Sequence, residues 1–235
     1  MKHEKVSSYW DLVACVLLNV EATASFDSDS PLASAPGDYH AYRFPGEVKL
    51  LKNDMTQLKL ISTDNIGYEK SYRLASVAQR YGNQPAQKSS PAVWVTIAGS
   101  RGSGLKKPLP AGNIRVYERD KQSEIFIGES RIGHTSTGQE IDISVGRAFD
   151  VSANRTQTSF RRFGEREAEV GYRIKMTNDK SEPVVVSVEE QLTGDWAIIS
   201  ESQKGTKRDS MTYVFELKVP SQGSAELEYS VRFRW

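Results

Sequence analysis

The chain has 235 residues, with 31 Lys and Arg, 30 Asp and Glu, and one cysteine. This length suffices for one large or two ordinary domains whose cores need no disulfides, and Cys15 alone excludes an intramolecular disulfide and a multi-cysteine zinc site. The net charge of +1 supplies no long-range field for nucleic acid or an anionic membrane, so neither is expected as a partner.

Residues 1–24 have the order of a secretory signal, because two lysines precede a short apolar run and an Ala-x-Ala triplet ends the segment. Asp11 beside the run and Asn19 within it depart from that pattern, and the run is too short to span a bilayer. The alternatives are a short helix packed on the body, or the remnant of a longer parent chain. Residues 25–37 are rich in Ser, Asp, Ala and Pro and predict a linker.

Alternating apolar and polar residues predict β-strands through most of the remaining chain. The end of the chain shows this best, since Leu227, Tyr229, Val231, Phe233 and Trp235 would share one buried face. In chain order, the expected strands are residues 47–52, 56–62, 67–75, 92–98, 113–119, 123–130 and 139–145, then 148–160, 166–177, 182–191, 195–201, 211–219 and 224–235.

Thirteen short strands exceed one ordinary sandwich, whereas seven and six are each a typical immunoglobulin-like set. We therefore predict an all-β protein of two tandem immunoglobulin-like antiparallel β-sandwiches with a short N-terminal appendage. The expected parts are residues 1–38 as a signal-like or linker segment, 39–146 as the first sandwich and 147–235 as the second. One elongated pair of sheets is the alternative. Residues 78–90 are almost free of apolar side chains and predict an exposed loop of the first sandwich.

Three stretches of the chain carry a resemblance to a known family. They are residues 38–43 (Asp-Tyr-His-Ala-Tyr-Arg), residues 104–117 (Gly-Leu-Lys-Lys-Pro-Leu-Pro-Ala-Gly-Asn-Ile-Arg-Val-Tyr), and residues 128–135 (Gly-Glu-Ser-Arg-Ile-Gly-His-Thr) leading into 146–151 (Gly-Arg-Ala-Phe-Asp-Val). In this order they resemble the bacterial family labelled domain of unknown function 4139, which includes mucoidy-inhibitor-like proteins, over about residues 38–235.

The resemblance implies a β-rich C-terminal region and a periplasmic or envelope-associated location, which becomes cytoplasmic if residues 1–24 are not a signal. It implies no established activity. This chain departs from the family pattern at Lys106, which stands where the family usually has a second glycine in the tight turn of that loop. Members with a longer chain carry a further β-rich region upstream, where this chain has 37 residues, which fits a short form or a chain that begins partway through a longer protein.

Four residues are candidates for contact with a partner or ligand: His134, Arg147, Asp150 and Trp196. His134 lies in a Gly-His-Thr turn and is expected to cap backbone groups there. The rival hypothesis is a hydrolase that uses His134 with Asp150 or Glu129. Trp196 is expected in the core of the second sandwich, with carbohydrate stacking as its alternative role.

No catalytic, metal or cofactor site is expected. The sequence lacks the Cys pairs and His-x-His spacing of zinc sites, and the glycine-rich residues 99–104 lack the ending of a phosphate-binding loop. Glu189 and Glu190 are adjacent, so on a strand they point to opposite faces and cannot form a glycosidase pair. Interleaved acids are expected to neutralise a solvated charge ladder made of Arg155, Arg161, Arg162, Arg166 and Arg173.

We expect a non-enzymatic, envelope-associated structural or protein-interaction module, whose partner binds at a sheet edge or at loops. The alternative is a carbohydrate-binding module with exposed aromatic side chains around Trp94, Trp196 or Tyr213, and a polysaccharide as its partner. Coplanar exposed rings would favour the sugar, whereas a long unpaired strand edge would favour the interaction module. No transmembrane segment and no cofactor are expected.

Overall fold

The computed structural model describes residues 12–17, 66–82, 84–97, 108–120 and 123–235. These residues form strands and no helix, which confirms the predicted all-β fold class. The expected strands at residues 47–52 and 56–62 lie outside the described residues. The strands are β1 (Leu12–Leu17), β2 (Tyr68–Ala78), β3 (Gln87–Ser89), β4 (Ala92–Ile97), β5 (Gly112–Asp120), β6 (Ser123–Ile132), β7 (Ile141–Arg147), β8 (Val151–Arg162), β9 (Glu167–Asn178), β10 (Val184–Leu192), β11 (Asp195–Glu201), β12 (Thr206–Lys207), β13 (Thr212–Val219) and β14 (Gly223–Arg234).

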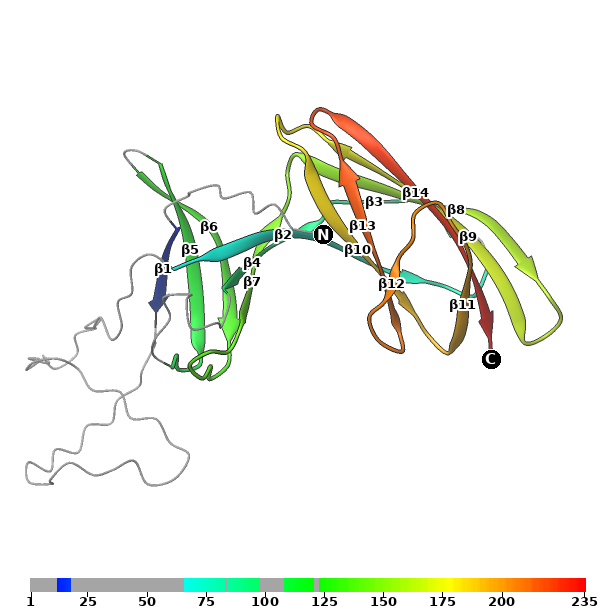
Figure 1. Cartoon of the computed structure of the whole chain (residues 1–235), viewed down its shortest axis with the longest axis horizontal. Helices are drawn as coiled ribbons and strands as arrows, with labels where there is room; N and C mark the ends of the chain where they lie inside the picture. Colours follow the sequence, from blue (N-terminus) through cyan, green and yellow to red (C-terminus); the bar gives the residue numbers. More distant parts are fainter. Residues whose placement is uncertain (1–11, 18–65, 83, 98–107, 121–122) are drawn as a thin grey trace, which may run out of the picture.

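The described strands form three sheets, which Figure 1 shows. The six-stranded sheet has the order β12-β13-β10-β2-β4-β7, the five-stranded sheet has the order β11-β14-β9-β8-β3, and the three-stranded sheet has the order β1-β5-β6. Neighbouring strands are antiparallel, except that β2 and β10 run parallel.

Two hydrophobic cores lie between these sheets. The larger core joins the five-stranded sheet to β2, β10 and β13, and the smaller core joins β5 and β6 to β4 and β7. In β14 the predicted alternation is confirmed, because Leu227, Tyr229, Val231 and Phe233 are at most 3% exposed. Trp235 departs from that prediction with 37% of its surface exposed, since it follows the last residue of β14 at the end of the sandwich.

Strand β2 lies within the six-stranded sheet and links β12, β13 and β10 on one side to β4 and β7 on the other. Its first part, Tyr68–Arg73, pairs with β4, and its second part, Tyr72–Ala78, pairs with β10. Two strands that precede residue 147, β2 and β3, therefore pair with strands that follow it. The immunoglobulin-like character of the sandwiches and their division at residue 146 stay predictions.

The expectation that residues 78–90 form an exposed loop of the first sandwich is wrong for Ala78 and residues 87–89, whereas residues 79–82 and 84–86 form no strand and are mostly exposed. Ala78 is 2% exposed in the larger core, and Gln87–Ser89 form β3, which pairs with β8 of the five-stranded sheet. The side chains of β3 are all exposed, so this strand is held by its backbone hydrogen bonds and leaves no apolar pattern in the sequence.

Strand β1 (Leu12–Leu17) pairs antiparallel with β5. The alternative of a short helix is therefore wrong for these residues, whose two valines favour an extended backbone. Export by residues 1–24 stays a prediction. Across the described part of the chain, no helix has the length and apolar character needed to cross a membrane.

An ion pair links β2 to the edge strand β7 across β4 in the six-stranded sheet. The Arg73 guanidinium of β2 donates a 3.1 Å hydrogen bond to the Asp142 carboxylate of β7, and the Thr96 hydroxyl of β4 donates another. Partial burial raises the pKa of Asp142, but the bonds from Thr96 and Arg73 outweigh it, so the pKa lies below the usual value.

Asp142→Asn is expected to make stability less sensitive to acid. The folded-state pKa of Asp142 is below its unfolded value of about 3.9, so its stabilisation is complete above about pH 5 and is lost as the pH falls through the folded pKa. The difference in urea midpoint between wild type and variant should be constant from about pH 5 to 7 and shrink below about pH 4. Asp195→Asn is the matched control. A difference in urea midpoint between wild type and Asp142→Asn that stays the same at every pH would contradict the lowered pKa of Asp142.

Candidate functional site

One edge of the five-stranded sheet is open along part of β8. Strand β9 pairs with β8 over its whole length, whereas β3 covers only the residues from Ala153 to Arg155 on the other side. The Gln157 side chain then accepts a hydrogen bond from the Gln84 backbone N–H. Beyond it, no strand among the described residues pairs with residues 158–162 on the side away from β9, and their side chains are all exposed. Such an edge presents unsatisfied backbone groups to a partner.

The outward-facing backbone groups of this edge follow from the pairing of β8 with β9. The Phe163 N–H donates a 2.8 Å hydrogen bond to the Glu167 carbonyl. Because the antiparallel ladder repeats every two residues, the N–H of Arg161 also faces β9, and those of Phe160 and Arg162 face the free edge. A bulge between Gln157 and Ser159 sets this register.

The side chains near the edge lie on two different faces of the sheet. Phe160 is opposite Val170, and Arg162 is opposite Ala168; both partners are fully buried, so this face carries the larger core. Phe160 is nevertheless 36% exposed, because β2 of the opposing sheet already ends at Ala78. Arg161 lies on the outer face.

Other exposed aromatic rings lie at the same end of the larger sandwich. Tyr81, Phe163 and Trp235 are 59%, 40% and 37% exposed. The Arg80 guanidinium carbon lies 5.1 Å from the Tyr81 ring centre and 5.2 Å from that of Trp235. The two rings are inclined at 61°, so they do not form the coplanar platform that would favour a sugar.

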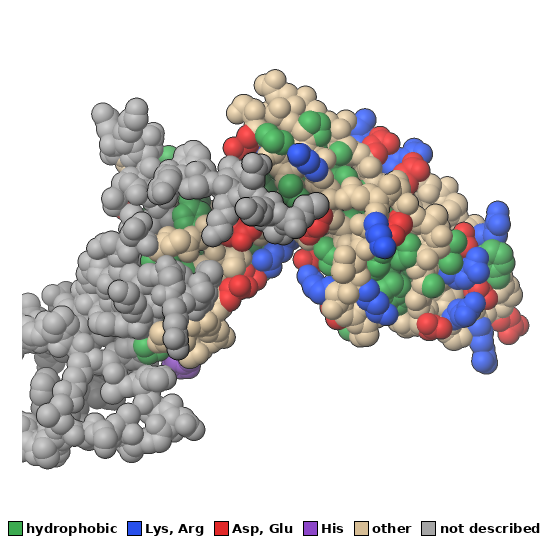
Figure 2. All heavy atoms as spheres, in the orientation of Figure 1, with side chains coloured by type: hydrophobic (Ala, Val, Ile, Leu, Met, Phe, Trp, Pro, Cys, Tyr) green, Lys and Arg blue, Asp and Glu red, His purple; other side chains and the backbone are tan. Residues whose placement is uncertain are grey.

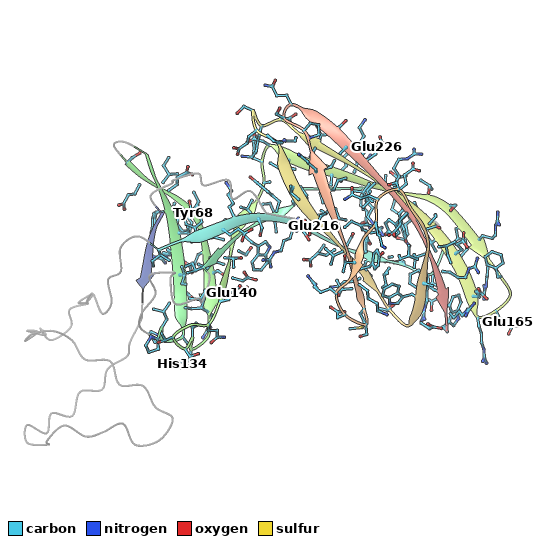
Figure 3. The ribbon with its side chains drawn as sticks, in the orientation of Figure 1. Tyr68, His134, Glu140, Glu165, Glu216 and Glu226 are labelled. Atoms are coloured by element: carbon cyan, nitrogen blue, oxygen red, sulfur yellow. The ribbon has the colours of Figure 1, made fainter. Side chains whose placement is uncertain are left out.

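A hollow of about 530 Å³ opens beside the β8–β9 hairpin, at the end where Figure 3 labels Glu165. Phe163 and Trp235 line it together with charged residues, whereas His134 and Asp150 do not. A second hollow, of about 420 Å³, lies over β3, β8 and β9, with Lys88, Asn154 and Lys175 in its lining.

We call the surface formed by Arg80, Tyr81, residues 160–163, Arg166 and Trp235 the hairpin surface.

The hairpin surface is basic. Glu167 lies 3.5 Å from Arg232 and 3.6 Å from Arg234, and Glu169 lies 2.8 Å from Arg232. The Arg162 guanidinium donates to the backbone carbonyls of Gly164 and Glu165. In the described part of the chain, no carboxylate lies within ion-pair distance of four arginines of this surface: Arg80, Arg161, Arg162 and Arg166.

The predicted neutral charge ladder is therefore wrong for three of its arginines. Glu169 is opposite Arg161 in the β8–β9 register, yet it binds Arg232 of β14, which is distant in sequence. Figure 2 shows Lys and Arg side chains gathered at this end of the larger sandwich. Arg173 alone follows the expectation, because it binds Glu228 on the outer face.

Arg155 was expected on the same solvated ladder, and this is wrong too. It is 6% exposed between the two sheets and donates two 3.1 Å hydrogen bonds to Glu190, which is fully buried. Tyr229 accepts a third bond from Arg155, and the Ser76 hydroxyl donates to Glu190 at 2.7 Å. Burial lowers the pKa of Arg155, but the Glu190 charge outweighs it and raises the pKa above its ordinary value.

The Arg155–Glu190 pair joins the two sheets rather than lining a ligand site. Its residues come from β8 and β10, and the guanidinium carbon lies 3.7 Å from the ring centre of Tyr172 on β9. Neither hollow described above includes it. Burial also raises the pKa of Tyr229 well above its ordinary value, so its hydroxyl stays neutral.

The structure does not bring the sequence-predicted site residues together. His134 is exposed in the smaller half (Figure 3), where its Nδ1 accepts a 3.3 Å hydrogen bond from the Ala111 N–H. The Arg147 guanidinium donates to the Ser90 carbonyl, and the Asp150 carbonyl accepts from the Asp179 N–H.

Trp196 packs against the larger core, as expected from the sequence. Its indole N–H donates to the Ser210 carbonyl at 2.9 Å, and the Lys207 ammonium lies 4.5 Å from its ring centre. Glu129, the other proposed partner of a catalytic His134, forms a 2.6 Å ion pair with Arg115. Lys207 thus lies over the Trp196 ring, on which a sugar was expected to stack in the alternative hypothesis. In the described part of the chain, no carboxylate forms a hydrogen bond with His134.

His134→Ala is expected to lower the free energy of unfolding by only about 0.5–1 kcal/mol, because its one hydrogen bond is long and exposed. This corresponds to a fall of about 1–4 °C in melting temperature for a chain of this size, measured by circular dichroism. Thr135→Val is the comparison, since Thr135 is buried and its backbone bridges to Leu109. An unchanged melting temperature together with loss of a hydrolytic activity of the wild type would identify His134 as functional instead.

No family model matches the chain, and no curated protein or solved structure is significantly similar to it. The resemblance to the domain of unknown function 4139 family therefore stays a prediction. Among the residues that the structure describes, no group of three or more His, Cys, Asp or Glu side chains is placed to hold a metal ion.

Sequence reasoning missed Arg80, Tyr81 and Trp235 as members of the hairpin surface. No local pattern connects them, because the contact between Arg80 and Trp235 joins positions that are 155 residues apart along the chain. The arginine ladder predicted from the sequence includes Arg161 and Arg162, but their lack of a carboxylate partner depends on Arg232 of β14, which binds Glu169.

Proposed function

We propose that the protein is a non-enzymatic, envelope-associated interaction module whose β8 edge receives an extended segment of a partner protein as an added strand. The observation that carries this proposal is the unpaired, exposed edge at residues 158–162. In strand addition, the backbone hydrogen bonds of the edge supply affinity and the neighbouring side chains supply specificity. Phe160 and Arg162 offer outward-facing N–H and C=O groups, and the hollow at Phe163 offers a place for a partner side chain.

The non-enzymatic part of the proposal has its own support. His134 bonds to a backbone N–H, Glu129 is paired with Arg115, and the buried Glu190 is paired with Arg155. The envelope location is supported by the signal-like order of residues 1–24 and by the family resemblance.

Peptides selected from a displayed random library against the full chain provide the test. Arg162→Pro and Arg162→Ala both remove the charge, but only proline removes the outward-facing N–H. We expect the selected peptides to bind the Pro variant at least about tenfold more weakly than the Ala variant.

Hydrogen exchange gives a second measurement of the same binding. The amides of Phe160 and Arg162 should become protected when peptide binds, whereas the Arg161 amide, which faces β9, should be protected with and without it. Equal affinity for the two variants, or binding that leaves both edge amides unprotected, would contradict strand addition. A selection that yields no binding peptide would contradict it as well.

The second candidate function is carbohydrate binding, which one observation favours: Trp235 and Phe163 line the hollow together with two glutamates and two arginines. The aromatic residues considered from the sequence, Trp94, Trp196 and Tyr213, are more buried than Phe163 and Trp235. Binding of a soluble oligosaccharide that is abolished by Trp235→Ala and unaffected by Arg162→Pro would support this second candidate over the first.

A further inference from the structure

We infer that the segment received by the β8 edge is acidic and has two consecutive carboxylate residues next to one large apolar residue. This inference rests on the proposed function and names the chemistry of its partner.

Charge complementarity carries the first step. Four arginines of the hairpin surface have no carboxylate within ion-pair distance in the described residues. Arg161 and Arg162 belong to the free edge itself. A guanidinium can bind a carboxylate with two parallel hydrogen bonds, so an acidic partner supplies the counter-charge that these arginines lack in the described residues, although Arg162 already donates to two backbone carbonyls.

Strand geometry fixes the spacing of the partner's acids. Arg161 lies on the outer face of the sheet and Arg162 on the core face, because they are opposite Glu169 and Ala168. An added strand places its own successive residues on these same two faces. One acid on each face therefore requires two acidic residues in direct succession.

The position of Phe160 predicts where the partner segment has its large apolar residue. Phe160 shares the core face with Arg162, two residues away, and is 36% exposed where the opposing sheet ends. A partner residue opposite Phe160 covers that ring and lies next to the acid that faces Arg161. The order is apolar, acidic, acidic for a parallel strand, and acidic, acidic, apolar for an antiparallel one.

The same charges disfavour a second copy of this chain as the occupant. Edge-to-edge pairing of two β8 strands places the arginines at 161 and 162 of one copy near those of the other, and like charges directly opposite are destabilising. The edge is thus protected against self-association and remains open to an acidic strand.

Three blocked synthetic peptides test the inference on the full chain, with Glu-Glu-Phe, Gln-Gln-Phe or Lys-Lys-Phe between identical Thr and Ser flanks. Each sequence is also made in reverse order, because the strand direction is not fixed by the argument. By fluorescence anisotropy, the Glu peptide should bind at least about tenfold more tightly than the Gln peptide, and its affinity should fall as salt rises. The Lys peptide should not bind.

Variants of the protein supply the controls. Arg161→Gln with Arg162→Gln should abolish the preference for the Glu peptide, whereas Arg173→Gln, which removes a paired arginine from the outer face of the same sheet, should leave it unchanged. Melting temperatures of the variants should stay close to that of the wild type, since both edge arginines are exposed.

The outcomes separate this inference from the proposed function. Equal binding of the Glu and Gln peptides overturns the acidic partner and leaves strand addition standing. Undiminished binding of a Glu peptide with N-methylated backbone amides overturns strand addition and leaves the acidic preference standing. An oligothymidylate of equal charge that competes with equal affinity identifies a general polyanion surface and overturns the inference, and binding of no peptide overturns both.

Discussion

Deletion of residues 229–235 is expected to leave a chain that does not fold cooperatively. The deleted residues include Tyr229, Val231 and Phe233, which are at most 3% exposed in the larger core. Truncating one such side chain costs about 2–5 kcal/mol, and the whole stability of a domain is about 5–15 kcal/mol. The deletion also removes the strand that pairs with β11, so that Asp195–Glu201 lose their only strand partner in the described chain.

Urea unfolding followed by far-ultraviolet circular dichroism measures this effect. Deletion of Trp235 alone is the control, and it should lower the stability by no more than about 1 kcal/mol, since this side chain is 37% exposed. A chain without residues 229–235 that still melts cooperatively within a few degrees of the wild type would show that β14 is not integral.

The strands with one buried face were predictable because their sequences carry a two-residue period. The expected strand at residues 195–201 matches β11, and the expected strands at 166–177 and 224–235 agree with β9 and β14 to within one residue at each end. Strands β3 and β12 were missed. Their side chains are exposed, so both exist only through backbone pairing with distant strands, β8 and β13, and no local pattern records such pairing.

The buried ion pair between Arg155 and Glu190 could have been predicted by the same argument. On β10 the buried face contains Val184, Val186 and Val188, and the same phase places Glu190 next on that face. On β8 the phase of Val151 and Ala153 likewise places Arg155 inside. A charged residue in phase with a buried row is therefore a signal of an internal pair.

The candidate site was less predictable than the core. The alternation of β8 predicts which residues share a face, but whether its edge is free depends on how far β3 extends along it. The charge of that surface likewise depends on Arg232, which takes Glu167 and Glu169 from the arginines near them in sequence. Both properties are set by contacts between strands that are distant in the chain, and a local pattern contains neither.

Glu190→Gln is expected to destabilise the protein by about 3–5 kcal/mol, because it leaves the Arg155 guanidinium buried without a counter-charge. A guanidinium cannot escape this cost by losing its proton. Arg155→Met should be destabilising as well, because it leaves the Glu190 carboxylate buried without its cation.

The double variant Arg155→Met, Glu190→Leu decides between the loss of charge balance and the loss of packing as the cause. If uncompensated charge dominates, the double variant should be more stable than either single variant, with a residual cost of about 1 kcal/mol for each hydroxyl, of Ser76 and of Tyr229, that loses its partner. Urea midpoints of the wild type, the two single variants and the double variant, all measured at pH 7, provide this double-mutant cycle. Additive losses would instead show that the two side chains stabilise the sheets independently, and that the pair does not act as a unit.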